Sequence, residues 1–155
     1  MKLLIIAVGD KMPGWVETAC AEYLKRMPRE ARVELIEVKP EKRGGQSVDR
    51  LKALEAARIL EKLPKGARLI ALDEHGQMPD TRGLAGLLQD WLAEGRDVAL
   101  VIGGADGLAP ELLQRAELKL ALSRLTLPHG LARVLLSEQL YRASSLLKGH
   151  PYHRE

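Results

Sequence analysis

The stretch "DVALVIGGADGLAPELLQRAELKLALS", residues 97–123, decides the fold class of this 155-residue chain. Its first eight residues, 97–104, form an apolar run that ends in two glycines and predicts a buried strand. Pro110 is suited to the first turn of a short helix over residues 110–117, and a second strand is predicted over residues 118–123. This order of strand, helix and strand indicates a parallel sheet with crossover helices.

The same alternation continues on both sides of that stretch. Ser47 suits the N-cap of one helix, while Gly95 and Gly149 suit the residues that end two others. We therefore expect one α/β domain over residues 1–155, with a mainly parallel sheet and helices on both faces. The further strands are predicted at residues 2–8, 32–38 and 67–73, and the further helices at about 15–27, 47–63, 81–95 and 131–148.

The composition is that of an ordinary globular protein. Apolar residues make up 46% and charged residues 29% of the chain, which argues against disorder. The single cysteine, Cys20, excludes a disulfide within the chain and favours a reducing compartment. The first apolar run reaches Gly9 too soon for a signal peptide or a membrane span. We expect a soluble, cytoplasmic protein without a membrane segment.

The net charge is only +3, but the basic residues are clustered. The clusters lie at residues 25–32, 39–43 and 142–154. Such clusters are found both on solvated surfaces and where proteins contact nucleic-acid phosphates, and charge alone does not separate the two interpretations. The four histidines lack the spaced partners of a zinc site, so we expect no metal.

Three strand ends carry the candidate ligand site, because ligands of parallel sheets bind beyond the carboxyl ends of the strands. Gly103 and Gly104 allow a tight turn or the close approach of a ligand, although neither a Walker loop nor a dinucleotide fingerprint is present. Asp73 suits either a ribose contact or the start of a turn. His129 and Arg133 are four residues apart on one predicted helix face, in a structural or a functional role.

The last helix has more apolar positions than one buried face needs. A second apolar face predicts that the helix packs against a partner, and a homodimer is the commonest such arrangement. Glu138 and Arg142 are four residues apart, in the order that favours an ion pair.

At this point the chain resembles a known family. The segments "VIGGADG", "LSRLTLPHGLARVLLSEQLYRA" and "PYHRE" are similar to those of the ribosomal large subunit methyltransferase H family, of the SPOUT superfamily. "VGDKMPGW" and "LDEHGQMPDT" fit as well, so the resemblance covers the full length. It implies a C-terminal trefoil knot, a homodimer, and methylation of N3 of a pseudouridine in 23S ribosomal RNA on the assembled ribosome.

The resemblance also implies S-adenosyl-L-methionine as the cofactor, held among the knot loops. The leucines of this set would supply apolar walls, and the glycines would let the cofactor lie against the backbone. Arg124 stands where a small or apolar residue is expected, so its side chain is expected to point away. The implied cofactor-binding residues are Leu72, Asp73, Gly103, Gly104, Leu122, Ser123, Arg124, Leu125, Thr126 and Leu127.

The implied catalytic residues lie near the C-terminus. His153 is the candidate base for the N3 proton. Glu138 is either an alternative base or the group that orients Arg142, and Tyr152 would stack on a base. Arg142 and Arg154 would bind phosphate or developing negative charge. We expect the tail to close over the cofactor pocket, either its own or that of the partner.

Three alternatives remain open on the sequence alone. The first is methylation of a transfer RNA, for example at a ribose 2′-hydroxyl. The second is a ribosome-binding assembly factor without catalysis, and the third is a small flavin- or nucleotide-binding module.

Overall fold

The chain folds around a five-stranded sheet in which every strand is parallel to its neighbours. The structure, a computed structural model, describes residues 1–154, with only the backbone of His153. The order of the strands is β2-β1-β4-β3-β5. The strands are β1 (Leu3–Val8), β2 (Val33–Val38), β3 (Arg68–Gln77), β4 (Val98–Ile102) and β5 (Leu118–Leu120).

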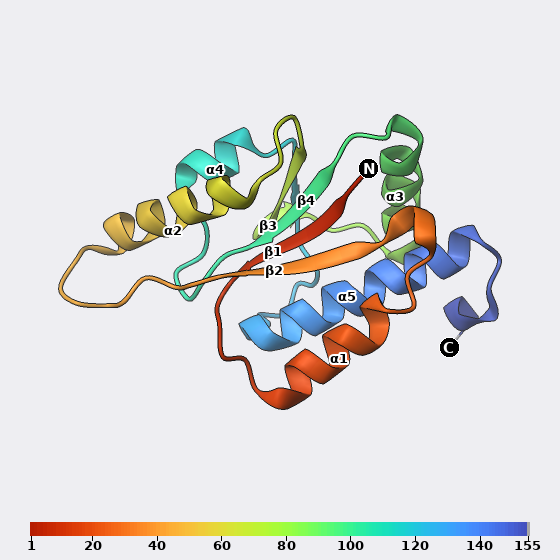
Figure 1. The fold of residues 1–155 in the computed structure, drawn as a ribbon, viewed down its shortest axis with the longest axis horizontal. Coiled ribbons are helices and arrows are strands. Elements are labelled where there is room, and N and C mark those ends of the chain that lie inside the picture. The colour runs from red at the N-terminus through yellow and green to blue at the C-terminus, as the bar shows by residue number, and fades with distance from the viewer. Residues whose placement is uncertain (155) are drawn as a thin grey trace.

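Helices cover both faces of this sheet, as predicted (Figure 1). One face carries α1 (Gly14–Leu24), α3 (Thr81–Glu94) and α5 (His129–Leu147), and the other carries α2 (Val48–Lys62) and α4 (Pro110–Arg115). Two short 3₁₀ helices complete the described chain, η1 (Arg29–Ala31) and η2 (Pro151–Arg154). The trefoil knot implied by the resemblance stays a prediction.

Three residues predicted to begin or end helices, Ser47, Gly95 and Gly149, are confirmed in that role. Ser47 caps α2, because its side chain accepts a hydrogen bond from Arg50 N at 3.1 Å. Gly95 follows α3 with a φ of 77°, a left-handed conformation that glycine adopts without strain. Gly149 follows α5 in the same region, with a φ of 68°.

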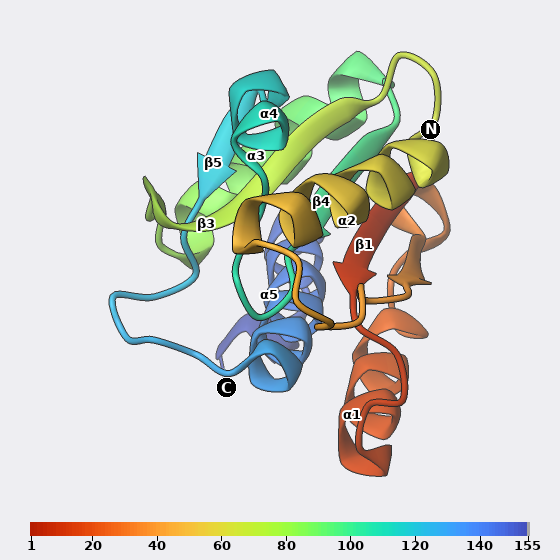
Figure 2. The same ribbon diagram turned by 90° about the vertical axis from the view of Figure 1, so that its left-hand side faces the viewer.

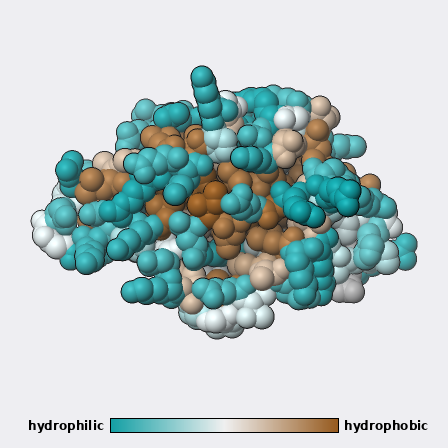
Figure 3. Space-filling model, in the orientation of Figure 1, coloured by the Kyte–Doolittle hydropathy of each residue, from teal (hydrophilic) through white to brown (hydrophobic). Residues whose placement is uncertain are grey.

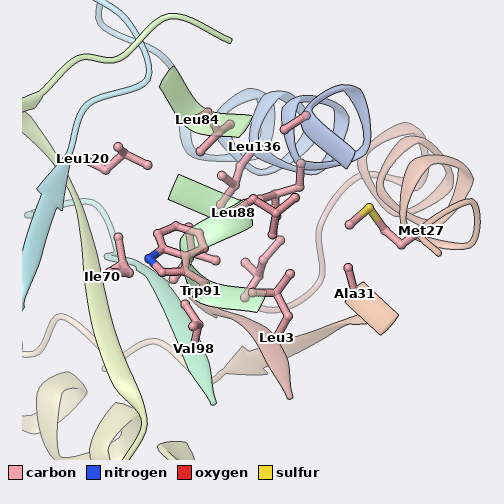
Figure 4. Close-up of a cluster of buried hydrophobic side chains, with 14 of the residues drawn as sticks. Leu3, Met27, Ala31, Ile70, Leu84, Leu88, Trp91, Val98, Leu120 and Leu136 are labelled. Carbon is pink, nitrogen blue, oxygen red and sulfur yellow. The ribbon is translucent and has the colours of Figure 1, made fainter. Parts of the chain in front are cut away.

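Two apolar layers hold the helices to the sheet. In the layer shown in Figure 4, Leu88 and Trp91 of α3 and Leu136 of α5 pack against Leu3 and Ile70 of the strands. The second layer, beneath α2 and α4, has its own buried cluster. β1 and β4 are buried along their whole length. Central parallel strands are covered on both faces, which explains their continuous apolar runs.

Several predicted boundaries are wrong. The strand predicted over residues 67–73 continues to Gln77, and the strand predicted over residues 118–123 ends at Leu120. The reason is a bulge, because Leu72 and Gln77 are both in register with Leu120. The polar residues between them give no period-two pattern.

The predicted end of the first helix and the predicted start of the last helix are also wrong. The first helix ends at Leu24 rather than near Met27, because the chain turns before Pro28 and buries Met27 against the sheet layer. The last helix begins at His129 rather than near Leu131, directly after Pro128. Proline fixes its own φ and limits the residue before it, so helices often start just after it.

The bulge depends on the absence of a side chain at Gly76. A Cβ at this position would lie 2.6 Å from the backbone carbonyl group of Lys119 in the neighbouring strand. We expect Gly76→Ala to lower the free energy of unfolding by about 1–3 kcal/mol, because β3 and β5 must separate.

The matched control is Gly86→Ala. Gly86 lies in α3, where a Cβ would meet nothing within 4 Å. This substitution should raise the free energy of unfolding by about 0.5–1 kcal/mol, since alanine is the better helix former. Urea denaturation of both variants measures the difference, and equal stabilities would contradict the proposed role of Gly76.

Candidate functional site

A cavity of about 380 Å³ lies at the carboxyl edge of the sheet. Its walls come from β3, from the segments that follow β4 and β5, and from the first turn of α5. Figure 2 shows this edge, with the segment that joins β5 to α5 looping outward at the lower left, beside the sheet. The volume is that of a pocket for a small organic ligand.

The cavity brings together three segments that are far apart in the sequence, as the sequence predicts. Nine of the ten residues predicted to bind the cofactor line it. Arg124 is the exception and is exposed. The lining members of the predicted set are Leu72, Asp73, Gly103, Gly104, Leu122, Ser123, Leu125, Thr126 and Leu127.

The glycine wall is a tight turn of the backbone. Gly107 N donates a hydrogen bond to Gly104 O at 3.1 Å, and Gly107 has a φ of 82°. A Cβ at Gly103 would lie 2.7 Å from the carbonyl carbon of Gly107. Gly103 therefore leaves no space for a side chain, and Gly107 has a backbone conformation that favours glycine. The wall presents backbone rather than side chains to the cavity.

The other walls combine apolar side chains with locally satisfied polar groups. The Asp73 carboxylate accepts a hydrogen bond from His75 N at 3.2 Å, so this side chain forms a turn and also lines the cavity. Ser123 Oγ accepts a hydrogen bond from Leu125 N at 2.9 Å. The Leu125 side chain is 76% exposed although it lines the cavity. An exposed apolar side chain at a cavity mouth is suited to cover a ligand.

A polar network centred on the buried side chain of Arg133 lies behind the cavity, and the sequence predicted only part of it. The Arg133 side chain is 1% exposed and forms an ion pair of 2.6 Å with Glu37. Arg133 also donates to Gly9 O at 3.1 Å and contacts His129 Nε2 at 3.0 Å. The spacing of His129 and Arg133 predicted a shared helix face, but Glu37 and Gly9 are distant in the sequence.

His129 connects this network to the glycine wall. Its Nδ1 lies 2.9 Å from Gly103 O, and its ring lines the cavity. Burial and the positive charge of Arg133 lower the pKa of His129 below the ordinary value for histidine. His129 is therefore neutral near pH 7.

The second group of predicted residues meets where the chain end folds back onto α5. Glu138 accepts hydrogen bonds from Arg142 Nε at 2.9 Å and from the Tyr152 hydroxyl at 2.8 Å. The Arg142 guanidinium lies 4.9 Å from the centroid of the Tyr152 ring, which also packs against Tyr141. The Glu138 carboxylate thus bonds to both Arg142 and Tyr152, and its two predicted roles, as a base or as the group that orients Arg142, stay predictions.

Burial, together with Glu138, raises the pKa of Tyr152, so its hydroxyl remains a donor. Arg154 is exposed, and the side chain of His153 lies outside the described residues.

The described residues of the tail do not line the cavity of their own chain. Only the first turn of α5 lines the cavity, whereas Tyr152 contacts Glu138, which lies about 14 Å farther along the helix axis. None of Glu138, Arg142, Tyr152 and Arg154 lines the cavity. The described part of the tail therefore lies away from the cavity of its own chain, and closure of the tail over a cofactor pocket stays a prediction.

The predicted basic clusters differ in how far their charges are paired. Lys25 and Arg26 share Glu22 as a partner. Arg43 forms an ion pair of 2.6 Å with Asp106, which connects the basic segment 39–46 to the glycine turn of the cavity.

Among the side chains that the structure describes, no group of three or more His, Cys, Asp or Glu residues is arranged to hold a metal ion. No helix in the described part of the chain is long and apolar enough to cross a membrane.

Comparison with known proteins supports one family over the whole chain. A family model described as a predicted SPOUT methyltransferase matches residues 1–153. A protein of Burkholderia ambifaria named ribosomal RNA large subunit methyltransferase H is 59% identical over 99% of both chains. A protein of the same name from Laribacter hongkongensis is 56% identical over the full length of both.

Solved structures share the fold at low identity. A probable methylase family protein from Haemophilus influenzae superposes with a TM-score of 0.61 and 18% identity, over 97% of this chain and 69% of that one. A probable methyltransferase from Bordetella pertussis gives a TM-score of 0.60 with 20% identity, over 92% of this chain and 94% of that one. At these identities the comparison establishes the fold alone.

The lowered pKa of His129 predicts a pH dependence of stability. In the unfolded chain the pKa returns to about 6.5, so the unfolded state binds more protons than the folded state as the pH falls below that value. Stability from His129 is complete above this pH and is lost below it. We expect the wild type to lose more free energy of unfolding than His129→Asn between about pH 7.5 and about pH 5.5.

Urea denaturation at the two pH values measures this difference. The control is His75→Asn, because the His75 side chain is 84% exposed. The control should follow the wild type, and equal losses in the wild type and His129→Asn would contradict the prediction.

Proposed function

This chain belongs to the SPOUT methyltransferase family, and from that premise we propose that it methylates N3 of a pseudouridine in 23S ribosomal RNA. The substrate is the assembled ribosome, and the methyl donor is S-adenosyl-L-methionine. The proposal is supported chiefly by relatives named ribosomal RNA large subunit methyltransferase H, at 56–59% identity over the whole chain. Such a substrate places the enzyme in the cytoplasm, where bacterial ribosomes are found.

The cavity fits this cofactor. Its glycine wall leaves room for a ligand against the backbone, and its volume of about 380 Å³ suits a nucleoside with a short side chain. Apolar walls from Leu72, Leu122 and Leu127 are suited to contact an adenine, and Asp73 is suited to a ribose. When bound, S-adenosyl-L-methionine supplies a methyl group already activated on a sulfonium.

The remaining chemistry falls to side chains of this chain. The N3 atom of the target must be held in line with the donor, and its proton must be removed. We assign proton removal to His153. Arg142 and Arg154 hold a phosphate or stabilise negative charge on the base, while Tyr152 stacks on it. The Glu138 carboxylate keeps Arg142 and Tyr152 in fixed positions.

The residues that line the cavity and the residues around Glu138 and Tyr152 do not meet within the described part of one chain. We therefore propose a homodimer in which each site combines the cavity of one chain with the tail of the other. Leu131 is 41% exposed, and Val134 and Leu135 are partly buried on the same side of α5. A second hollow, of about 310 Å³, lies against Leu135 and shares Leu122 with the cofactor cavity. A partner packed on this side of α5 would bring its tail to the cavity mouth.

The basic segment 39–46 is suited to contact RNA phosphates near the same cavity. It follows β2 and is joined to the glycine turn by the ion pair of Arg43 and Asp106. Polar and charged residues cover most of the face shown in Figure 3, around a band of apolar residues near β2. Exposed Lys39 and Lys42 add positive charge at this end of the molecule.

Labelled S-adenosyl-L-methionine tests the proposed substrate. Label transferred to one pseudouridine of assembled ribosomes lacking the modification, and mapped to that nucleotide, is the expected result. Free ribosomal RNA and transfer RNA serve as the comparison substrates. Transfer confined to transfer RNA would replace the proposal with a tRNA methyltransferase, and ribosome binding without any transfer would replace it with an assembly factor.

Removal of the tail tests its catalytic role. Deletion from Pro151 should abolish methyl transfer, because it removes the candidate base and the residues assigned to hold the target. The truncated chain should still fold, because the described residues of the tail belong to neither the cavity lining nor the buried core. S-adenosyl-L-methionine binding, measured by calorimetry, should change less than about threefold. Normal turnover by the truncated chain would contradict the assignment of His153, Tyr152 and Arg154.

A mixing experiment then tests whether the tail acts across the dimer. The truncated chain is combined with Leu125→Arg, which places a positive charge at the cavity mouth without disturbing the core. Each variant alone should be inactive. The co-refolded mixture should recover about a quarter of the wild-type rate, because about half of its dimers are heterodimers and each of these carries one complete site of two. Absence of recovery would show that the sites are not composite.

A further inference from the structure

Arg133 is a buried cation that connects three strands to α5. Its guanidinium contacts Glu37 of β2 at 2.6 Å and Gly9 O, directly after β1, at 3.1 Å. Through His129 it also reaches Gly103 O, directly after β4. Burial of a guanidinium has a large desolvation cost, and an apolar side chain of similar volume is often at least as stabilising. Stability alone therefore does not explain this arginine.

The chemistry of the side chains fixes the direction of each hydrogen bond. Arginine has donors only, so His129 Nε2 must accept a hydrogen bond from Arg133. The proton of the neutral imidazole then lies on Nδ1, which donates to Gly103 O at 2.9 Å. Arg133 thereby selects one tautomer of His129 and excludes a second proton from Nε2.

The bond to Gly103 fixes a wall of the cofactor cavity. Gly103 and Gly104 line the cavity, and the turn that follows them is closed by Gly107. A turn this tight moves as a unit, so anchoring the Gly103 carbonyl anchors the wall. There is little space for adjustment at Gly9, where a Cβ would lie 3.1 Å from the Arg133 guanidinium.

We propose that Glu37, Arg133 and His129 form a positioning relay that holds the Gly103–Gly104 wall in place for the cofactor. The relay also keeps His129, a residue of the cavity wall, uncharged beside a cofactor that carries a net positive charge. His129 and Arg133 are positioning residues, because they act through the backbone of the glycine wall. This inference rests on the proposed function, since it assigns the relay to binding of S-adenosyl-L-methionine.

The test compares substitutions that keep or remove the anchor. Asparagine at position 129 places an amide donor near the Nδ1 position, whereas alanine removes the donor. We expect His129→Ala to weaken S-adenosyl-L-methionine binding by about tenfold or more, and His129→Asn to restore binding to within about threefold of the wild type. Arg133→Met, which fills the same space without charge, should retain the melting temperature but weaken binding by about tenfold.

Calorimetry with S-adenosyl-L-methionine alone and thermal melting give the two readouts. In the transfer assay, KM for the cofactor should rise in the same order, while KM for ribosomes stays constant. His75→Ala and Arg115→Lys are the matched controls, since both residues are exposed.

His129→Ala with unchanged affinity, or His129→Asn as weak as His129→Ala, would overturn the relay. If Arg133→Met fails to fold, the two His129 variants still decide. A wild type that does not bind the cofactor would instead refute the proposed function.

Discussion

All five strands run in one direction, and the position of the site follows from this constraint. In a parallel sheet the carboxyl ends share one edge, so the segments that follow β1, β2, β4 and β5 all leave from the same side. The basic segment, the glycine turn and the apolar segment before α5 are therefore neighbours despite their separation in the sequence. The amino ends of the same strands contribute nothing to the cavity. The chain thus concentrates its chemistry on one edge and leaves the two helical layers to stabilise the sheet.

Much of this arrangement could be predicted from the residues. Buried parallel strands give continuous apolar runs, and glycines mark the ends of α3 and α5, so the α/β class and most elements follow from local patterns. The family resemblance identified the segments that line the cavity. Of the ten residues that it implied for cofactor binding, Arg124 alone is not part of the cavity lining. Glu138 and Arg142 were predicted as a pair because helical neighbours four residues apart share a face.

The remaining features depend on contacts that no local pattern reveals. The extension of β3 to Gln77 is set by pairing with β5 around a bulge, and its polar residues resemble those of a loop. The partners of Arg133 come from β2 and from the turn after β1, 96 and 124 residues away in the sequence. The end of the first helix is set by burial of Met27 rather than by helix propensity. In each case tertiary packing overrides the local preference.

The 19-residue helix α5 acts as a rigid spacer between the two halves of the proposed chemistry. Its first turn carries His129 at the cavity, and its later turns hold the tail through Glu138 and Arg142. Each added or deleted residue would rotate everything beyond it by about 100° and shift it by about 1.5 Å. Even a single inserted residue would therefore turn the tail away from its direction of approach, whereas surface segments such as residues 39–46 tolerate changes in length. Among homologous chains, the count of residues between His129 and Tyr152 should consequently vary far less than the identity of the exposed residues within it.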